Sequence, residues 1–315
     1  MNIAVITSGG DSPGMNPCIA KLVLEGERRG HRVFGYIGGY RGIQADKPVA
    51  LRSRDVYGLF KLGGTVLKSG RLPELVEPEV RRSILEKLRR DEINTLVVMG
   101  GDGSFRGAMA LGEMSPDATG VNFVGIPCTI DNNIFGSDYT LGHDTAFNKL
   151  TQYIDDITDT ALSMFSRVFL VETLGGHDGY FARSMEDIGL CDFSVTEEHP
   201  LSCGEVVERI ADTLSSGNKS FVIISVAEHC ETALIAKAVR SKLGIDPKIN
   251  IIGYQQRGGV PTALERLHAA SFALYALRAV ESGIRNKYII FSDGKYGYMD
   301  FSSVENVKPF RPWVR

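Results

Sequence analysis

The sequence predicts an α/β fold built mainly from parallel strands that alternate with helices. Short runs rich in β-branched residues alternate with longer segments of helical period along the 315 residues, which is the pattern of successive βαβ units. Many glycines come directly after the predicted strands, where open α/β sheets bind ligands. A chain of this length suits two domains or one large α/β unit. The expected strands are residues 2–7, 33–37, 95–99, 121–126, 167–172, 220–226, 249–253 and 288–291.

Helices are expected between these strands. Pro78 favours the first turn of a helix, and Val80, Ile84 and Leu88 recur after it on one helical face. A later segment rich in Ala and Leu predicts a buried helix. The clearest predicted helices are residues 78–90, 144–162 and 262–281.

The composition argues against several classes of protein. The net charge of −3 leaves no basic excess for binding nucleic acid, and Lys and Arg form no block along the chain. No apolar run approaches the length of a membrane helix, and residues 1–7 lack the basic region of a signal peptide, so we expect a cytoplasmic protein. Five cysteines without a CxxC pair indicate neither a disulfide framework nor a zinc site.

Two glycine-rich loops follow predicted strands and suit phosphate binding. In residues 7–16, Gly9 and Gly10 let the backbone approach a ligand, and the following helix offers unpaired N–H groups to an anion, although a plain tight turn has the same composition. In the run GGDGS at residues 100–104, Asp102 can hold Mg²⁺ while the backbone cradles phosphates. No GKS or GKT follows, so this loop is not a P-loop.

A third loop, residues 127–133, contains a candidate general base. Thr129 and Asp131 stand with two amide side chains directly after a strand, as phosphoryl transfer to an alcohol requires. An Asx-rich turn has a similar composition.

Two further glycine-rich loops, residues 63–71 and 253–259, contribute cations. Arg71 and Arg257 suit bidentate phosphate recognition, although a single arginine is more often a solvated surface charge. Five such loops at strand ends, with two carboxylates and several cations, favour one phosphoryl-transfer site over five unrelated turns.

The order of these motifs resembles that of bacterial ATP-dependent 6-phosphofructokinases, of which the chain looks like a divergent member. The resemblance runs from residue 2 to about residue 310 with few insertions. It rests on SGGD at 8–11, PGMN at 13–16, GYRG at 39–42, GGT at 63–65 with Ser69 and Arg71, GGDGS at 100–104, TIDN at 129–132, VE at 171–172, EH at 228–229 and QRGG at 256–259.

The resemblance implies two Rossmann-like, three-layer α/β domains with mainly parallel sheets. Residues 1–138 and 254–304 would form the ATP-binding domain, and residues 139–253 and 305–315 the sugar-phosphate-binding domain. It also implies a homotetramer or homodimer whose active sites are shared between subunits. The implied reaction is Mg²⁺-dependent transfer of a phosphoryl group from ATP to fructose 6-phosphate, giving fructose 1,6-bisphosphate, with neither nucleic acid nor membrane as a partner.

Roles for individual residues follow from their positions in these motifs. Asp131 would take the proton from the acceptor hydroxyl, with Thr129, Gly10 and Arg71 also catalytic, and Asp102 would hold Mg²⁺. ATP would be bound by Gly10, Tyr40, Arg71, Gly101, Asp102, Gly103, Ser104 and Gly107. The sugar phosphate would be bound by Thr129, Asp131, Asn133, Arg167, Leu174, Gly175, Gly176, Glu228, Lys248, Tyr254 and Arg257.

The phosphoryl donor follows from size and charge. Family members that use pyrophosphate have a second Asp where this chain has Gly103 and a Lys where it has Cys128. The extra carboxylate would crowd out the α-phosphate and the nucleoside, while the Lys would balance a compact pyrophosphate. Because neither is present, ATP is the expected donor.

Several residues depart from the family pattern near the acceptor. Asn133 replaces an Asp, Gly176 replaces an Arg, and Lys248 and Tyr254 replace an Arg and a His. Because Asn133 and Gly176 remove one negative and one positive charge together, we hypothesise that fructose 6-phosphate is a poor or secondary substrate. The alternatives are a kinase for another sugar phosphate, such as sedoheptulose 7-phosphate or tagatose 6-phosphate, and a non-catalytic binding protein.

The effector site of the family also lacks its paired arginines. Ala20, Leu24 and Asp159 stand at those positions, so allosteric control of the usual kind is not expected.

Overall fold

The chain folds into two compact units. The structure, a computed structural model, describes residues 1–45, 47–115, 120–165, 167–176, 179–217 and 219–309. The large unit comprises Met1–Thr145 and Arg257–Lys308, and the small unit is built from Ala146–Gln256. The sequence placed the divisions after residues 138, 253 and 304, and residues 310–315 of that prediction lie outside the described residues.

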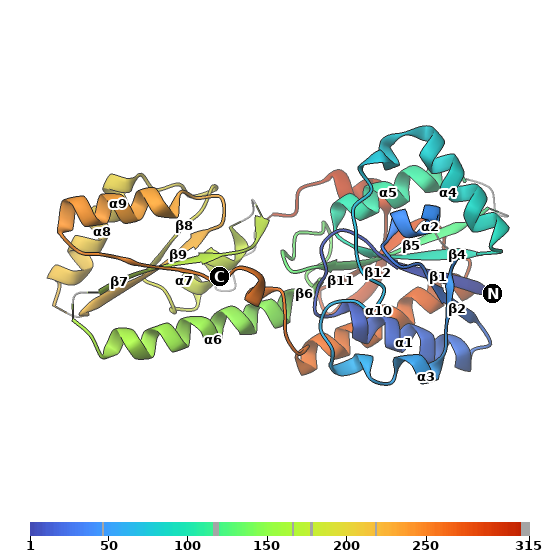
Figure 1. The fold of residues 1–315 in the computed structure, drawn as a ribbon, viewed down its shortest axis with the longest axis horizontal. Coiled ribbons are helices and arrows are strands. Elements are labelled where there is room, and N and C mark those ends of the chain that lie inside the picture. Colours follow the sequence, from blue (N-terminus) through green and yellow to red (C-terminus); the bar gives the residue numbers. More distant parts are fainter. Residues whose placement is uncertain (46, 116–119, 166, 177–178, 218, 310–315) are drawn as a thin grey trace. The chain divides into compact units, whose positions relative to one another are not determined.

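An eight-stranded sheet forms the centre of the large unit (Figure 1). Its strands run in the order β12-β11-β5-β4-β1-β2-β3, with β6 paired to β5. Neighbouring strands are parallel except at the two ends, where β12 and β3 are antiparallel to their neighbours. The strands are β1 Asn2–Thr7, β2 Arg32–Gly35, β3 Val49–Leu51, β4 Thr95–Gly100, β5 Asn122–Thr129, β6 Leu141–Gly142, β11 Lys287–Ser292 and β12 Lys295–Asp300.

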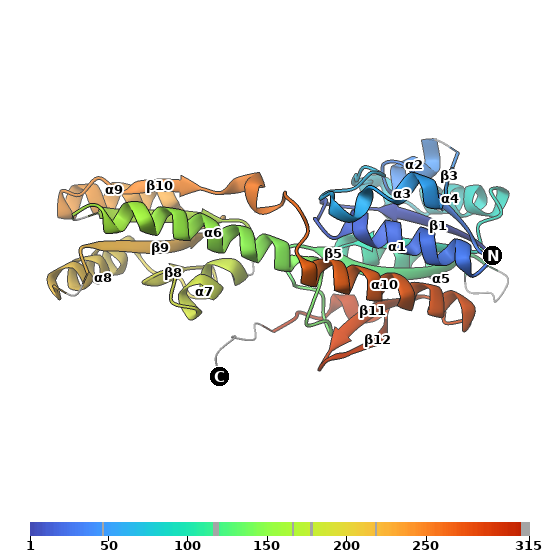
Figure 2. The same ribbon diagram turned by 90° about the horizontal axis from the view of Figure 1, so that it is seen from below.

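Helices cover both faces of this sheet, so its central strands are apolar throughout. β4 is buried along its whole length, as expected of a parallel strand covered on both sides. α1 and α10 pack together on one face, and α2, α4 and α5 cover the other (Figures 1 and 2). The helices are α1 Met15–Arg28, α2 Tyr40–Ala45, α3 Ser53–Val56, α4 Pro78–Arg90, α5 Asp102–Glu113 and α10 Ala263–Glu281.

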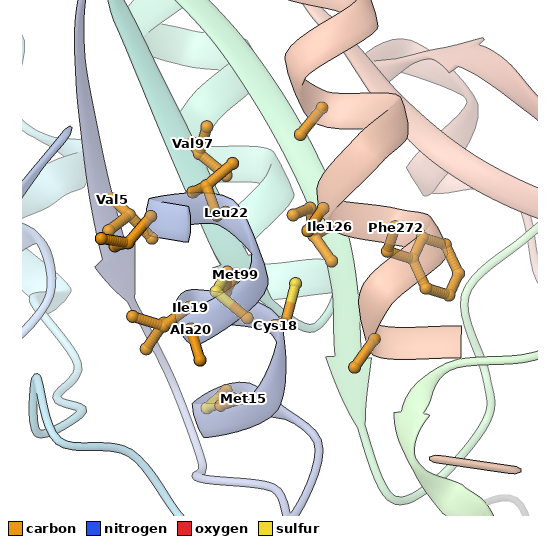
Figure 3. Close-up of a cluster of buried hydrophobic side chains, with 14 of the residues drawn as sticks. Val5, Met15, Cys18, Ile19, Ala20, Leu22, Val97, Met99, Ile126 and Phe272 are labelled. Carbon is orange, nitrogen blue, oxygen red and sulfur yellow. The ribbon is translucent and has the colours of Figure 1, made fainter. Parts of the chain in front are cut away.

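The core between α1, α10 and the sheet fixes the loop that leads into α1. Figure 3 shows Cys18 of α1 beside Met99 of β4, Leu22 of α1 beside Val97 of β4, and Phe272 of α10 beside Ile126 of β5; Met15 lies at the start of α1 in the same cluster. These side chains are excluded from solvent. Burial of such side chains contributes roughly 1.5–3 kcal/mol each, so the first turn of α1 is held firmly against the sheet.

A four-stranded, fully parallel sheet forms the small unit. Its order is β10-β7-β9-β8, and the central strand β9 is buried throughout. Helices α8 and α9 pack on one face through an apolar cluster. The elements are α6 His143–Leu162, β7 Arg167–Thr173, α7 Tyr180–Asp187, β8 Phe193–Val195, α8 Cys203–Ser215, β9 Phe221–Ala227, α9 Thr232–Leu243 and β10 Lys248–Ile251.

Local sequence sets the ends of several elements. Ser202 and Glu205 form a reciprocal cap at the start of α8, in which the Ser202 N–H donates to the Glu205 carboxylate at 2.8 Å. Short 3₁₀ helices in the described part of the chain include η1 Leu59–Lys61, η2 Pro73–Val76, η4 Gly253–Gln256 and η5 Phe301–Glu305.

The predicted α/β class with mainly parallel sheets is confirmed. β1 and α4 have the predicted bounds, whereas β3, β6, β8 and β12 were not predicted. β3 and β8 have three residues each, too few to show a period, and they form because a neighbouring strand is already in place. Among the described residues, no helix has the length and apolar character needed to span a bilayer.

Candidate active site

The loops singled out by the sequence follow three neighbouring strands of the large unit. β1 and β4 are in register at Thr7 and Met99, and β4 and β5 at Gly100 and Pro127. Because the three strands are parallel, their carboxyl ends lie at one edge of the sheet. The loops after β1, β4 and β5 therefore meet where open α/β sheets bind ligands.

Close packing between the first two loops requires glycine. A Cβ on Gly100 would lie 2.4 Å from the Ser104 Oγ and 2.6 Å from the Ser8 carbonyl oxygen. The Ser8 N–H donates to the Met99 carbonyl at 2.9 Å, and Gly9 has a φ of +84°, which favours glycine. The two backbones are thus joined side by side; the first leads into α1 and the second into α5.

Asp102 is the first residue of α5, and its carboxylate is held by an arginine one turn later. Arg106 Nη1 donates to Asp102 Oδ2 at 2.7 Å, and Arg106 Nε donates to Glu305 Oε1 at 3.1 Å. The Asp102 side chain is 51% exposed. A carboxylate with this exposure fits a kinase magnesium ion, which is bound by one or two carboxylates together with substrate phosphates.

The loop that carries Asp102 lies next to the loop that carries the candidate base, because the strands that lead into them are paired. A Cβ on Gly101 would lie 3.8 Å from the Thr129 Cβ, which is ordinary contact distance. A Cβ on Gly103 would meet nothing within 4 Å. Gly103 therefore borders open space on the phosphate-binding loop.

Two other residues that were predicted to bind ATP, Tyr40 and Gly107, are buried behind the start of α5. Tyr40 is buried and its hydroxyl donates to the Ser104 carbonyl at 2.8 Å. A Cβ on Gly107 would lie 2.6 Å from Leu75 and 3.2 Å from the Tyr40 ring. Tyr40 and Gly107 therefore support the first turn of α5, whereas Arg71 is exposed at the surface.

The candidate base belongs to a loop held by internal hydrogen bonds. Thr129 Oγ1 donates to Asp131 Oδ2 at 3.2 Å and accepts from the Asp131 N–H at 3.2 Å. Asn132 adopts a left-handed φ of +50°, and its Nδ2 donates to the Asp138 carbonyl at 3.1 Å. Asn133 follows, half-buried. The sequence thus brings Thr129 and Asp131 together as predicted.

The buried carboxylate of Glu265 holds β6, the short strand that pairs with the end of β5 before this loop. β6 pairs with β5 at Gly142 and Thr129. Glu265 accepts hydrogen bonds from the Gly142 N–H at 2.7 Å and from the Thr145 N–H and hydroxyl at 3.3 and 3.1 Å. Burial raises the pKa of Glu265 to about 7, although these donors act in the opposite direction.

Arg257 lies against the loop after β1. Its Nη2 donates to the Asp11 carbonyl and to Asp11 Oδ1, both at 3.1 Å. A Cβ on Gly10 would lie 2.2 Å from the same Nη2. Gly10 therefore provides the space in which the guanidinium rests.

In the small unit, Glu228 binds the loop after β7. Glu228 Oε1 accepts from the Gly175 N–H at 3.1 Å and from the Gly176 N–H at 2.6 Å. Gln256 Oε1 accepts from the Leu174 N–H at 2.9 Å. The two acceptors fix the loop 174–176, and Gly176 has a φ of +63° that favours glycine.

Two predicted cations lie at the amino-terminal ends of their strands in the small sheet, away from Glu228. Arg167 and Lys248 begin β7 and β10, which are parallel, whereas the loop 174–176 and Glu228 follow the carboxyl ends of β7 and β9. A seven-residue strand spans about 20 Å. Within one small unit, these cations and Glu228 therefore do not meet, and Lys248 instead pairs with Asp246 at 3.0 Å.

Sequence reasoning did not assign roles to several residues that organise the site. These are Asp11, Arg106, Gln256 and Glu305. The spacing of Asp102 and Arg106 is the i, i+4 spacing of helical ion pairs, so Arg106 could have been found from the sequence. Glu305 could not, because it lies 199 residues from Arg106.

Comparisons with known proteins agree with this fold. The family model described as phosphofructokinase matches residues 2–280. The ATP-dependent 6-phosphofructokinase of Aquifex aeolicus is 32% identical over 312 residues, covering 98% of this chain and 96% of the relative. That of Vibrio cholerae is 35% identical over 307 residues, covering 97% and 94%.

Solved structures give the same result for the fold. Pichia pastoris phosphofructokinase in the T-state has a TM-score of 0.89 at 27% identity, over 96% of this chain and 37% of that one. A pyrophosphate-dependent phosphofructokinase from Marinobacter aquaeolei has a TM-score of 0.84 at 18% identity, over 98% and 85%, and shows the fold alone. The two mainly parallel sheets, with helices between their strands, define a parallel α/β protein. The chain belongs to the phosphofructokinase family.

Proposed function

We propose that this chain is an ATP-dependent kinase that phosphorylates fructose 6-phosphate to fructose 1,6-bisphosphate. The observation that carries the proposal is the adjacency of the loop of Asp102 and the loop of Thr129 and Asp131, which follow the paired strands β4 and β5. It brings a candidate metal ligand and a candidate base to one edge of one sheet. The relatives named ATP-dependent 6-phosphofructokinase, which match nearly the whole chain, support the same reaction.

The proposed mechanism assigns one task to each loop. Asp131 accepts the proton of the attacking hydroxyl, and the hydrogen bond from Thr129 keeps one carboxylate oxygen oriented. Asp102 would hold Mg²⁺ together with ATP phosphate oxygens, and the ion, when bound, offsets their negative charge. The glycine loop after β1 offers backbone N–H groups, and Arg257 beside it offers a cation to a phosphate.

ATP is the donor that the described residues favour. The open space beside Gly103 leaves room for a nucleotide next to the metal ligand. Cys128 is buried, and burial raises the pKa of its thiol well above the ordinary value, so the side chain is neutral. It therefore supplies no positive charge of the kind that a compact pyrophosphate would need.

Fructose 6-phosphate is the acceptor that the relatives support. The hypothesis that it is a poor or secondary substrate, drawn from Asn133 and Gly176, is not favoured by relatives whose names specify that activity. The small unit supplies a Glu228 that is fixed by loop amides and positioned beside Gly176. Sedoheptulose 7-phosphate and tagatose 6-phosphate become control acceptors in the assay.

We infer that the active sites are shared between subunits of a homo-oligomer. Arg167 lies about 20 Å from the carboxyl edge of its own sheet, and Lys248, which pairs with Phe169, lies about 13 Å from that edge. In the expected role, both would therefore serve a second copy of the chain. Mixing tests this directly. Asp131→Ala and Arg167→Ala variants, each inactive alone, should regain activity when reassembled together, since some sites then contain neither substitution.

The division of labour between the units is part of the proposal. The large unit would bind MgATP and the small unit the sugar phosphate, as the motif positions imply. We expect the enzyme to act in the cytoplasm, where both substrates are present.

A coupled assay of fructose 1,6-bisphosphate formation tests the reaction. We expect turnover with MgATP and fructose 6-phosphate and none with pyrophosphate as sole donor. Asp131→Ala should abolish most turnover, while Glu113→Ala, an exposed carboxylate on α5, should leave it unchanged. A protein that binds ATP but turns over no acceptor would overturn the proposal, and a higher kcat/KM with another sugar phosphate would replace the acceptor.

A further inference from the structure

A second candidate binding site lies in the small unit, apart from the residues assigned to the reaction. It is a cavity of about 200 Å³ lined by residues of α7, β8 and α8 and of the loop between β8 and α8. β8 is the edge strand of the sheet, at the opposite edge from β10. Because β8 has no neighbour on one side, residues from helices on both faces of the sheet can meet around its open edge.

Two pairs of side chains form the wall of this cavity. Glu186 accepts from the Ser194 N–H at 2.9 Å and from the Ser194 hydroxyl. Arg183 Nη1 contacts His199 Nε2. Because arginine can only donate, the ring nitrogen is the acceptor of any hydrogen bond in this contact.

The side chains of two further groups in the lining make no hydrogen bond or ion pair in the described part of the chain. Asp187 Oδ2 is buried without a hydrogen-bond partner, whereas buried polar groups are normally satisfied. Arg209 is exposed, and it makes no ion pair with any described carboxylate, although hydrogen bonds from Ser202 and, to a smaller extent, the Arg209 charge lower the pKa of Glu205 on the same helix. Its guanidinium carbon lies 5.6 Å from the Phe193 ring centroid. One unsatisfied carboxylate and one unpaired guanidinium thus border the same cavity.

We propose that this cavity binds a small zwitterion of the size of an α-amino acid, with its ammonium group on Asp187 and its carboxylate on Arg209. The lining carries two arginines and two carboxylates, so it is neutral overall. A dianionic phosphate or a free divalent cation would leave a net charge in the cavity, whereas a zwitterion leaves none. The terminal torsion of an aspartate is soft, so the carboxylate can turn to meet the ligand.

The proposal is tested by binding, independently of the kinase reaction. Each of the proteinogenic L-amino acids is titrated into the full-length protein and followed by calorimetry, with propionate, ethylamine, inorganic phosphate and Mg²⁺ as probes of the separate charges. Asp187→Asn and Arg209→Gln keep the side-chain shape and remove one charge each. Glu208→Gln, an exposed neighbour on α8 outside the lining, is the matched control.

We expect at least one amino acid to bind and the single-charge probes to bind far more weakly. Each lining variant should weaken binding by about tenfold or more, the usual worth of a hydrogen bond to a charged group, while Glu208→Gln should not. Kinase turnover of all three variants should equal that of the wild type, which shows that they fold. No binding up to about 10 mM, an affinity weaker than the millimolar scale, equal binding by the lining variants, or preferential binding of phosphate or Mg²⁺ would each overturn the proposal.

Discussion

Replacing Gly10 with alanine should damage the proposed active site while leaving the fold nearly intact. The new Cβ would lie 2.2 Å from Arg257 Nη2, whereas ordinary contact begins at 3.4 Å. The guanidinium must therefore move by about 1.2 Å, the difference between these distances. Both of its hydrogen bonds to Asp11, now 3.1 Å long, would exceed hydrogen-bonding distance.

The size of each effect follows from the surroundings of the pair. The Arg257 and Asp11 side chains are 26% and 48% exposed, and an ion pair of this exposure stabilises the fold by at most about 1 kcal/mol. A hydrogen bond from a charged donor to a substrate phosphate is worth about 1.5–3 kcal/mol. We therefore expect kcat/KM for fructose 6-phosphate to fall by roughly 10- to 100-fold, with a fall in Tm of only about 2–4 °C.

Two other glycine substitutions make the experiment decisive. Gly100→Ala would press against the backbone oxygen of Ser8, so it should destabilise the fold by about 1–3 kcal/mol. Gly58→Ala meets nothing within 4 Å and should change neither property. Steady-state kinetics and thermal melting of the three variants check this. If Gly10→Ala keeps kcat/KM within about twofold, or melts as early as Gly100→Ala, the position inferred for Arg257 is wrong.

Three further predictions concern carboxylates. Asp102→Asn should remove most Mg²⁺-dependent turnover, since metal charge stabilisation supplies several kcal/mol. If this variant keeps more than about a tenth of the wild-type kcat, Asp102 is not the metal ligand. Glu113→Gln is the control variant. Asp131→Ala should lower kcat by roughly 10²–10⁴-fold and leave ATP affinity nearly unchanged, and the reverse pattern in kinetics would make it a binding residue. Glu265 has a pKa raised to about 7 by burial, so the native state holds a proton that the unfolded state has released. Its contribution to stability is therefore complete below about pH 4.5 and is lost as the pH rises through about 7, a change of up to about 3 kcal/mol. Chemical denaturation between pH 4 and 8 should show this decline in the wild type, and an equal decline in Glu265→Gln would assign it to another group.

The ion pair between Asp102 and Arg106 has a bearing on the proposed metal site. Arg106 Nη1 lies 2.7 Å from Asp102 Oδ2. This carboxylate oxygen would otherwise be available to a ligand. Both side chains are about half exposed, so breaking this pair costs no more than about 1 kcal/mol. The pair can therefore orient Asp102 before the nucleotide arrives without preventing it from binding a metal.

The sequence alone identified the α/β class, the main strands and the loops at the site. Strand β4 is a continuous apolar run, and α4 has Pro78 at its first turn and apolar residues on one face. These are local properties, because burial on both faces or on one face leaves a period that the sequence records. Thr129 and Asp131 were also accessible, since their hydrogen bonds join residues two positions apart.

Tertiary structure decided which distant residues complete each loop. Arg257 reaches Asp11 across 246 residues, and Arg106 reaches Glu305 across 199. It also decided that Arg167 lies at the opposite edge of its sheet from Glu228, although both had been assigned to one phosphate site. Spacing along the chain records only contacts within a turn of helix or along a strand, whereas these positions depend on strand order and direction, which are set when the separate elements pack together.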